Sequence, residues 1–189
     1  MRCDWARYNQ LMQKYHDEEW GVPVHNDQLL FEHLILDVFQ AGLSWQTILN
    51  KREQFREAFD EFSIEKIADY NHKKIDELTK NPGIIRNYQK IEAAIANAKC
   101  VLEIQKEFGS FDTYIWQFTG GTTIHNHFEK LTDLPANSPQ SDAMSRDLRK
   151  RGFKFTGSTI CYAFMQAVGM FNDHLTSCFR YEPIVNLSD

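Results

Sequence analysis

The sequence has no excess of positive charge, no long apolar run and few cysteines. Its 21 Lys and Arg residues stand against 26 Asp and Glu, so the net charge is −5 and the isoelectric point is near 5.8. That balance argues against a protein that coats nucleic acid non-specifically. No apolar run approaches the ~20 residues needed to cross a bilayer, and the N-terminal residues contain no apolar signal region. We therefore expect a cytoplasmic protein that does not act in a membrane, and its four cysteines favour reduced thiols or metal ligands over disulfides.

The sequence does contain enough apolar residues for one domain built from helices. Of its 189 residues, 42% are hydrophobic, which fits a single domain over residues 1–189 with a sizeable core. Apolar side chains recur at spacings of three and four at Ile91, Ile95, Ala98 and Leu102, the period of a helix with one buried face. No convincing strand pattern is present, so the expected fold class is all-α.

Two predicted helices meet at a short connection, residues 82–86. Pro82 ends the first helix, and Gly83 can adopt a positive φ before the second helix begins. Such a connection directs backbone N–H groups outward at a helix N-terminus, where a phosphate binds without any net positive charge. The whole unit spans about residues 73–107. An ordinary turn between two helices is the alternative that these residues leave open.

Cysteine and histidine residues lie near both ends of the chain. Cys3 and His16 precede the first strongly apolar run, while His174 and Cys178 are four residues apart, a spacing that brings both to one face of a helix. One pair from each end gives Cys₂His₂, the composition of a closed tetrahedral zinc site. The alternative is that these side chains pack or cap helices without a metal ion.

Residues 30–39 form an apolar run with almost no polar face, and Asp37 lies within it. We expect a central buried helix there. Gly42 ends this helix and leaves Leu43 on a tight turn just before Trp45. An ionised carboxylate is costly to bury unless it is paired or lines a cavity. Asp37 is then either a structural carboxylate bonded to the amides of the turn or a group that faces a cavity.

Six segments, taken in order along the chain, resemble the 3-methyladenine DNA glycosylase I family of the helix–hairpin–helix DNA glycosylase superfamily. They are residues 15–23, 40–45, 82–86, 150–155, 159–162 and 172–174. This resemblance covers nearly the whole chain and implies a helix–hairpin–helix glycosylase fold whose two ends are joined by a structural zinc ion. The activity it implies is hydrolysis of the N-glycosidic bond of 3-methyladenine in double-stranded alkylated DNA. Since nothing in the sequence suggests an oligomer, we expect a monomer.

The resemblance also implies roles for individual residues. Asp37 takes the catalytic position, and the damaged base is bound by Tyr15, Trp45, Trp5 and Trp20. The DNA is contacted by Gly42 and Leu43, of which Leu43 fills the gap left by the flipped base, and by the hairpin residues Pro82, Gly83, Ile84, Ile85 and Arg86. The zinc ligands are Cys3, His16, His174 and Cys178, from terminal segments of about residues 1–25 and 170–180.

Two departures from the family pattern bear on the expected chemistry. Asp37 stands where the family usually has glutamate, so its oxygens reach roughly 1.5 Å less far, and a misplacement of about 1 Å can cost on the order of 100-fold in rate. The family also often has an aromatic residue near Met12. A non-catalytic or weakly catalytic module that binds alkylated DNA is therefore the alternative function.

Two further hypotheses concern the type of reaction. Members of the superfamily that also cut the DNA strand carry a lysine in the hairpin where this chain has Asn87, so a monofunctional enzyme that leaves an abasic site is the better interpretation. A zinc hydrolase that uses His125 and His127 is a third hypothesis. It lacks a third ligand or a general base near these histidines in the sequence.

Overall fold

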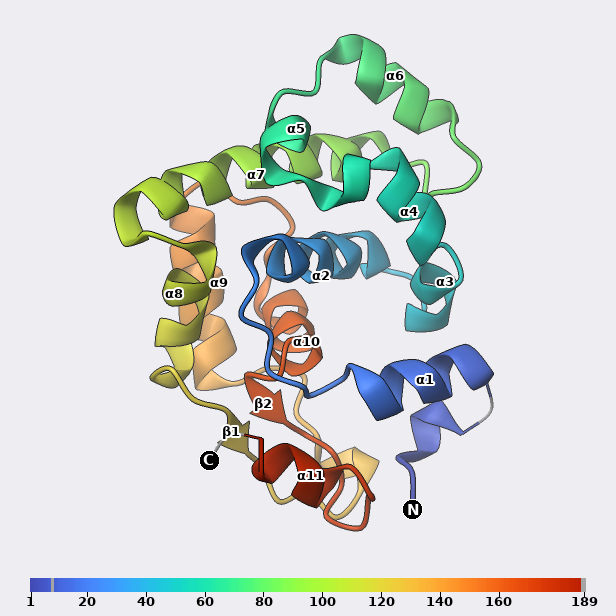
Figure 1. The fold of residues 1–189 in the computed structure, drawn as a ribbon, viewed down its shortest axis with the longest axis vertical. Coiled ribbons are helices and arrows are strands. Elements are labelled where there is room, and N and C mark those ends of the chain that lie inside the picture. The colour runs from blue at the N-terminus through green and yellow to red at the C-terminus, as the bar shows by residue number, and fades with distance from the viewer. Residues whose placement is uncertain (8, 188–189) are drawn as a thin grey trace.

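The computed structural model describes residues 1–7 and 9–187, most of which lie in helices (Figure 1). The α-helices are α1 (Gln10–Glu18), α2 (Asp27–Gln40), α3 (Trp45–Leu49), α4 (Arg52–Ala58), α5 (Ile64–Ala68), α6 (His72–Lys80), α7 (Tyr88–Phe108), α8 (Phe111–Trp116), α9 (Pro139–Lys150), α10 (Ser158–Ala167) and α11 (Tyr181–Val185). Short 3-10 helices are η1 (Asp4–Ala6), η2 (Asp60–Phe62), η3 (Gln117–Thr119) and η4 (Leu131–Asp133). Among the described residues, every helix is too short or too polar to span a membrane.

Helix α2 lies at the centre of the molecule, as its apolar sequence predicts. Every residue from Leu30 to Phe39 is buried. In Figure 1, helices α4 to α7 lie on one side of α2, and α1, α10 and α11 lie on the other. The helix begins at Asn26, whose side chain accepts a hydrogen bond from the amide of Leu29. Because residues 30–39 of α2 are buried, the polar side chains among them face either protein or an internal cavity.

Two short strands depart from the predicted fold class. β1 (Ile124–His125) and β2 (Phe171–Asn172) pair in parallel, with Ile124 opposite Phe171. A strand of two residues is too short for an alternating pattern to be seen in the sequence. The fold remains mostly helical, but the expectation of a structure without strands was wrong in this detail.

Some helix boundaries also differ from the sequence prediction. The apolar pattern of residues 45–59 predicts one helix, yet the chain leaves helical geometry at Lys51, which separates α3 from α4. Ser141 is by residue type a good N-cap and so predicts a helix that begins after it, yet helix α9 begins at Pro139 with Ser138 as its cap. Ser141 instead completes a capping box with Ser138, so it is the third residue of the helix.

Within residues 1–7 and 9–187, the buried apolar side chains form two clusters. The larger one contains α2 and the helices around it. The smaller one joins the two ends of the chain and contains Cys3, Tyr15, Trp20, Leu49, Leu175 and Cys178. A backbone hydrogen bond of 2.8 Å from the amide of Phe179 to the carbonyl of Met1 joins the same two ends. The candidate site lies at this smaller cluster.

Candidate active site and metal centre

A cavity of about 330 Å³ lies between α1, α2, α3 and α10. Its walls are largely aromatic, with polar groups contributed from α2 and α10. The rings and polar groups that could contact a bound molecule belong to Trp5, Tyr15, Trp20, Trp45, Asp37 and Gln166. The sequence prediction named the first five, and the structure brings all five to one cavity.

The aromatic side chains of the cavity pack as two pairs. The rings of Tyr15 and Trp45 have centroids 5.1 Å apart, and those of Trp5 and Trp20 are also 5.1 Å apart at nearly a right angle. Edge contacts of this kind hold ring faces in fixed positions. The cavity therefore has the shape and polarity to accept a flat aromatic molecule, and a cationic one is favoured by the ring faces.

The carboxyl group of Asp37 is buried in the wall of this cavity. Asp37 is only 3% exposed, and among the described residues its Oδ2 has no hydrogen-bond partner. Desolvation by burial raises the pKa of this carboxyl well above its usual value. The sequence left open that amides of the turn after α2 donate hydrogen bonds to this carboxylate. At Oδ2 the structure contains no such bond among the described residues.

A second buried polar atom near Asp37 also lacks a partner. The indole Nε1 of Trp45, which lines the same cavity, has no acceptor within the described residues. Buried polar groups without partners are rare in folded proteins and often mark a place where a ligand completes the hydrogen bonding. One acceptor and one donor thus remain available to a molecule in the cavity.

The turn after α2 exposes Leu43 close to the cavity. Gly42 has a φ of 81°, a conformation that glycine adopts without strain, and Leu43 is 40% exposed. The buried Lys90 of α7 fixes this turn, because its Nζ donates to the carbonyls of Phe39 at 2.9 Å and Ala41 at 2.6 Å. Lys90 therefore caps the C-terminus of α2, so its charge is directed at these carbonyls and not at a phosphate.

In the connection between α6 and α7, the backbone conformation of Gly83 differs from the prediction. Gly83 is not among the residues with positive φ. It is needed for space, because a Cβ there would lie 3.0 Å from Gln54 and from Asn81. The amide of Gly83 donates to Asn81 Oδ1 at 2.8 Å, whereas the amides of Ile85 and Arg86 have no acceptor in the part of the chain that the structure describes.

Lys51, between α3 and α4, forms hydrogen bonds with the connection between α6 and α7. Its Nζ donates to the carbonyl of Pro82 at 2.9 Å and approaches that of Gly83 at 3.4 Å. The connection and α3 therefore lie on the same side of the molecule. In Figure 1, helix α9, which leads into the basic run 149–154, lies on the opposite side of α2 from α3.

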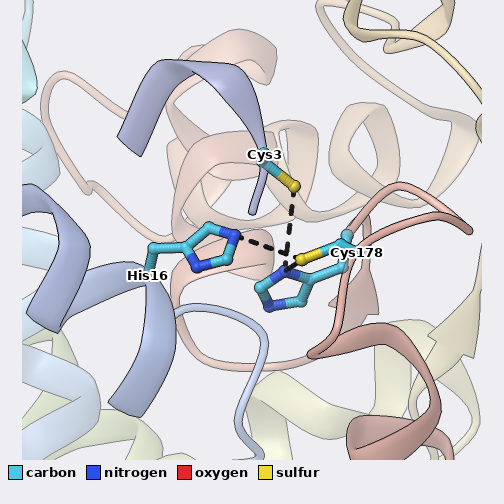
Figure 2. A group of neighbouring side chains, drawn as sticks. Cys3, His16 and Cys178 are labelled. Atoms are coloured by element: carbon cyan, nitrogen blue, oxygen red, sulfur yellow. Dashed lines mark hydrogen bonds between the residues drawn. The ribbon is translucent and has the colours of Figure 1, made fainter. Parts of the chain in front are cut away.

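Cys3, His16, His174 and Cys178 form a buried cluster next to the cavity. One ligand atom from each lies within 4.8 Å of all the others. Cys178 Sγ is 3.5 Å from His16 Nε2 and 3.6 Å from His174 Nδ1, and Cys3 Sγ is 4.0 Å from His174 Nδ1. Figure 2 shows Cys3, His16 and Cys178 pointing toward one another. Tetrahedral zinc ligands of these types are separated by roughly 3.3–3.8 Å. The distances of 3.5, 3.6 and 4.0 Å lie within or slightly above this range, so the cluster could hold a metal ion.

The two histidines of the cluster are oriented by hydrogen bonds to oxygen. His174 Nε2 is 2.9 Å from the carbonyl of Trp20, and His16 Nδ1 is 2.8 Å from Asp17 Oδ1. Each contact places the N–H on the outer nitrogen and turns the lone pair of the other nitrogen toward the cysteines. This is how metal-binding histidines are usually held. A cluster that only packed in the core would not require it.

The cluster forms by a different local structure from the one that the spacing predicts. The prediction puts His174 and Cys178 on one face of a helix, but residues 174–178 form turns, in which Cys178 N donates to the carbonyl of Leu175 at 2.7 Å. The turns bring the two side chains together just as well, so the predicted helical setting was wrong while the four side chains still meet.

His125 and His127 do not join this cluster. His125 Nδ1 is 3.3 Å from Asn172 Nδ2, and His127 Nδ1 is 2.7 Å from the hydroxyl of Tyr181. Among the described residues, the only group of Cys, His, Asp or Glu side chains with the spacing of a metal site is the cluster of Cys3. The structure therefore gives the hypothesis of a zinc hydrolase no support.

Gln166 and Asp17 were missed by the sequence analysis. Gln166 lies in the cavity wall, and Asp17 orients His16. A single glutamine on an apolar helix carries no signal in the sequence. Asp17 directly follows His16, a predicted metal ligand, and this position was the only indication in the sequence that it orients that histidine.

The chain is similar over almost its whole length to known proteins. The profile of the methyladenine glycosylase family matches residues 5–181. The chain is 42% identical over 180 residues to DNA-3-methyladenine glycosylase 1 of Escherichia coli (strain K12), covering 95% of this chain and 96% of the relative. It is 44% identical over 177 residues to the DNA-3-methyladenine glycosylase of Haemophilus influenzae, covering 94% and 96%.

Solved structures agree with the sequence comparison. A crystal structure of 3-methyladenine DNA glycosylase I matches with a TM-score of 0.92 at 45% identity, covering 95% of this chain and 98% of the other. The 3-methyladenine DNA glycosylase I of Staphylococcus aureus, from a structural study of 3-methyladenine recognition, matches with a TM-score of 0.92 at 33% identity, covering 95% and 96%.

Proposed function

This chain belongs to the methyladenine glycosylase family, and we propose that it excises 3-methyladenine from DNA by hydrolysing the bond between base and sugar. The observation that carries the proposal is the buried carboxyl group of Asp37 in an aromatic cavity, whose Oδ2 has no hydrogen-bond partner in the described part of the chain. Such a site suits a flat cation that arrives with hydrogen-bond donors of its own.

The chemistry of the damaged base explains why an aromatic cavity is useful. Methylation at N3 gives adenine a positive charge, which weakens the bond to the sugar and makes the neutral base a good leaving group. The enzyme then has to take the nucleotide out of the helix, hold it and admit water. Each well-placed ring contributes on the order of 1–2 kcal/mol to binding a cation where water is excluded, and Tyr15 with Trp45 supplies two such rings.

Asp37 contributes discrimination between damaged and normal adenine. Burial raises its pKa, so the ionised form is disfavoured in the empty cavity. A cationic base brought close to the carboxyl offsets that cost, because opposite charges attract strongly in a medium of low polarity. Neutral adenine brings no such compensation. The ionised carboxylate then accepts from the exocyclic amine of the base.

We further propose that the face carrying Leu43 and the α6–α7 unit binds double-stranded DNA. Leu43 would fill the space of the flipped base, as the resemblance implies. The α6–α7 unit would be the helix–hairpin–helix element, with the amides of Ile85 and Arg86 directed at a phosphate. Support comes from these two amides, which have no acceptor among the described residues, and from Lys90 of α7, whose bonds to two carbonyls at the end of α2 join this unit to the turn of Leu43.

We also propose that Cys3, His16, His174 and Cys178 bind a structural zinc ion. Four protein ligands leave no open position for water, so the metal would stabilise the fold and would take no part in the reaction. Its position supports a role in shaping the cavity, because Trp20 packs on His174 with ring centroids 4.7 Å apart and Trp5 packs on His16 at 5.3 Å.

The enzyme is proposed to be a monomeric, single-domain, monofunctional glycosylase. Asn87, at the hairpin position where strand-cutting relatives have lysine, caps α7 by accepting from the amide of Lys90 at 3.1 Å. An asparagine cannot form the imine with the sugar that strand cleavage requires. The product is then an abasic site in an intact strand.

The test is to incubate the protein with duplex DNA treated with a methylating agent and to identify released bases by chromatography. We expect free 3-methyladenine, with strand breaks that appear only after alkali treatment. Strand breaks without alkali would contradict the monofunctional assignment. Tight binding to alkylated DNA without any released base would favour the non-catalytic recognition module.

A further inference from the structure

Gln166 places a fixed amide group in the wall of the base cavity. Its side chain lines the cavity together with Asp37, and its Nε2 donates to Asp173 Oδ2 at 2.7 Å. Its backbone carbonyl accepts from the amide of Gly21 at 3.1 Å, so the end of α10 that carries the side chain is also held. Neither the ring contacts nor the carboxyl group of Asp37 accounts for this polar group in the wall.

Asp173 determines which polar atom of the Gln166 amide can face the cavity. It is 1% exposed and receives three donors: the hydroxyl of Tyr162 at 2.6 Å, Nε2 of Gln166 at 2.7 Å and Nδ2 of Asn126 at 2.7 Å. A carboxylate surrounded by donors acts as an acceptor only. Rotating the amide of Gln166 by half a turn would place two acceptors in contact. The amide nitrogen is therefore held by Asp173, and Oε1 is the atom available to a bound molecule.

We propose that Gln166 is a specificity-determining residue, whose amide oxygen acts beside Asp37 as a second acceptor for the exocyclic amine of the base. This inference rests on the proposed function, and it makes the group at C6 of the base the feature that the enzyme selects. A 3-methylated purine with an amine at C6 is accepted. One with a carbonyl oxygen there, 3-methylguanine, is rejected.

The discrimination follows from hydrogen bonding in a closed space. The amine of adenine has two hydrogens, which can satisfy two acceptors. The C6 oxygen of guanine has only lone pairs. It would face the two acceptors, Asp37 and Gln166 Oε1, and all three groups would then lack a hydrogen-bond donor. A site built to hydrogen-bond one group rejects an analogue without it, because its own buried polar atoms then lose their partners.

The experiment measures both bases in one reaction. DNA treated with a methylating agent contains 3-methyladenine and 3-methylguanine, and single-turnover release of each gives a ratio of rate constants that does not depend on the amount of folded enzyme. We expect a ratio in favour of 3-methyladenine for the wild type and a fall of about tenfold in that ratio for Gln166→Met, which keeps the size of the side chain and removes the acceptor.

Tyr162→Phe is the matched control. It removes another hydrogen bond to the same oxygen of Asp173 and leaves the amide of Gln166 in place, so the ratio should stay at the wild-type value. An unchanged ratio in Gln166→Met, or an equal fall in both variants, overturns the proposal. If the wild type releases neither base, the proposed function itself fails, an outcome that is distinct from an active enzyme with an unchanged ratio.

Discussion

At the scale of single residues, the buried carboxyl of Asp37, which we propose contacts the damaged base, is costly to the fold. The carboxyl lies in the wall of an aromatic cavity, and nothing in the described chain donates to its Oδ2. Natural proteins keep such groups where function requires them. The free energy that is lost by burying this carboxyl should increase as pH rises, and this dependence can be measured.

Asp37→Asn should stabilise the protein at neutral pH. Burial raises the pKa of Asp37 in the folded state, so the folded protein holds this proton more tightly than the unfolded chain does. Its contribution to stability is then lost as pH rises from the unfolded pKa of about 4 toward the raised folded value. We expect the variant to gain about 1–3 kcal/mol at pH 7 and little near pH 4, as measured by urea denaturation.

The control for this measurement is Asp69→Asn, which neutralises an exposed carboxyl. It should change stability by less than about 0.5 kcal/mol at either pH. A loss of stability in Asp37→Asn at pH 7 would mean that the carboxylate has a partner in the folded protein, contrary to the structure.

The cysteine and histidine cluster makes a second prediction at this scale. Purified protein should contain one zinc ion per chain by elemental analysis. Cys178→Ala should remove it and lower the melting temperature by about 10 °C, because metal binding stabilises the folded state only. Cys161→Ala removes a buried thiol outside the cluster and should keep the zinc. Full metal content in Cys178→Ala would exclude the proposed ligand set.

At the scale of helices and turns, Lys90 connects α7 to the end of α2. Its ammonium group donates to two carbonyls of the last turn of α2, next to Gly42 and Leu43. Those carbonyls have no partner within their own helix. The position of Leu43 thus depends on a residue of the proposed DNA-binding unit.

Lys90→Met should therefore weaken the enzyme without touching the cavity wall. Removing the ammonium group leaves the carbonyls of Phe39 and Ala41 without their donor, and we expect a loss of about 1–3 kcal/mol in stability. Base release from DNA should slow by about tenfold, since the turn that carries Leu43 is no longer fixed. Lys99→Met, on the same helix but exposed, is the control and should leave both quantities unchanged.

The same scale explains what the sequence could predict. Helices α2, α6 and α7 follow from apolar spacing and caps, because the signal lies within each segment. The break at Lys51, the β1–β2 pair and the turns of residues 174–178 depend on contacts between distant segments, so local patterns miss them. The Cys and His residues suggested a possible metal site, and resemblance alone named the four proposed ligands. The proposed role of Gln166 could not be inferred from the sequence, because it depends on the position of Asp173 in the fold.

At the scale of the whole molecule, an acidic protein has to bind a polyanion. The net charge of −5 opposes DNA at long range, and the basic run after α9 reaches the α6–α7 unit through Lys154, whose backbone bonds Asn97 of α7. Binding must then rely on a few local contacts, such as the exposed Arg86 and the amides beside it. We expect a weak dependence of affinity on salt.

This expectation can be measured as the slope of log K against log salt concentration for duplex DNA. Arg86→Ala should reduce the magnitude of the slope by about 1, because one phosphate contact is lost. Arg146→Ala, on α9, removes the same charge on the other side of α2 and should leave the slope unchanged. Equal effects of both variants would show that overall charge governs binding, and not the hairpin.

The measurement that tests the central claim most directly is single-turnover release of 3-methyladenine by wild type, Asp37→Asn and Asp37→Glu. We predict release by the wild type, a loss of at least about 100-fold with asparagine and a gain with glutamate, whose longer side chain reaches further into the cavity. Equal rates for wild type and Asp37→Asn would contradict the assignment of Asp37 as the carboxylate on which excision depends.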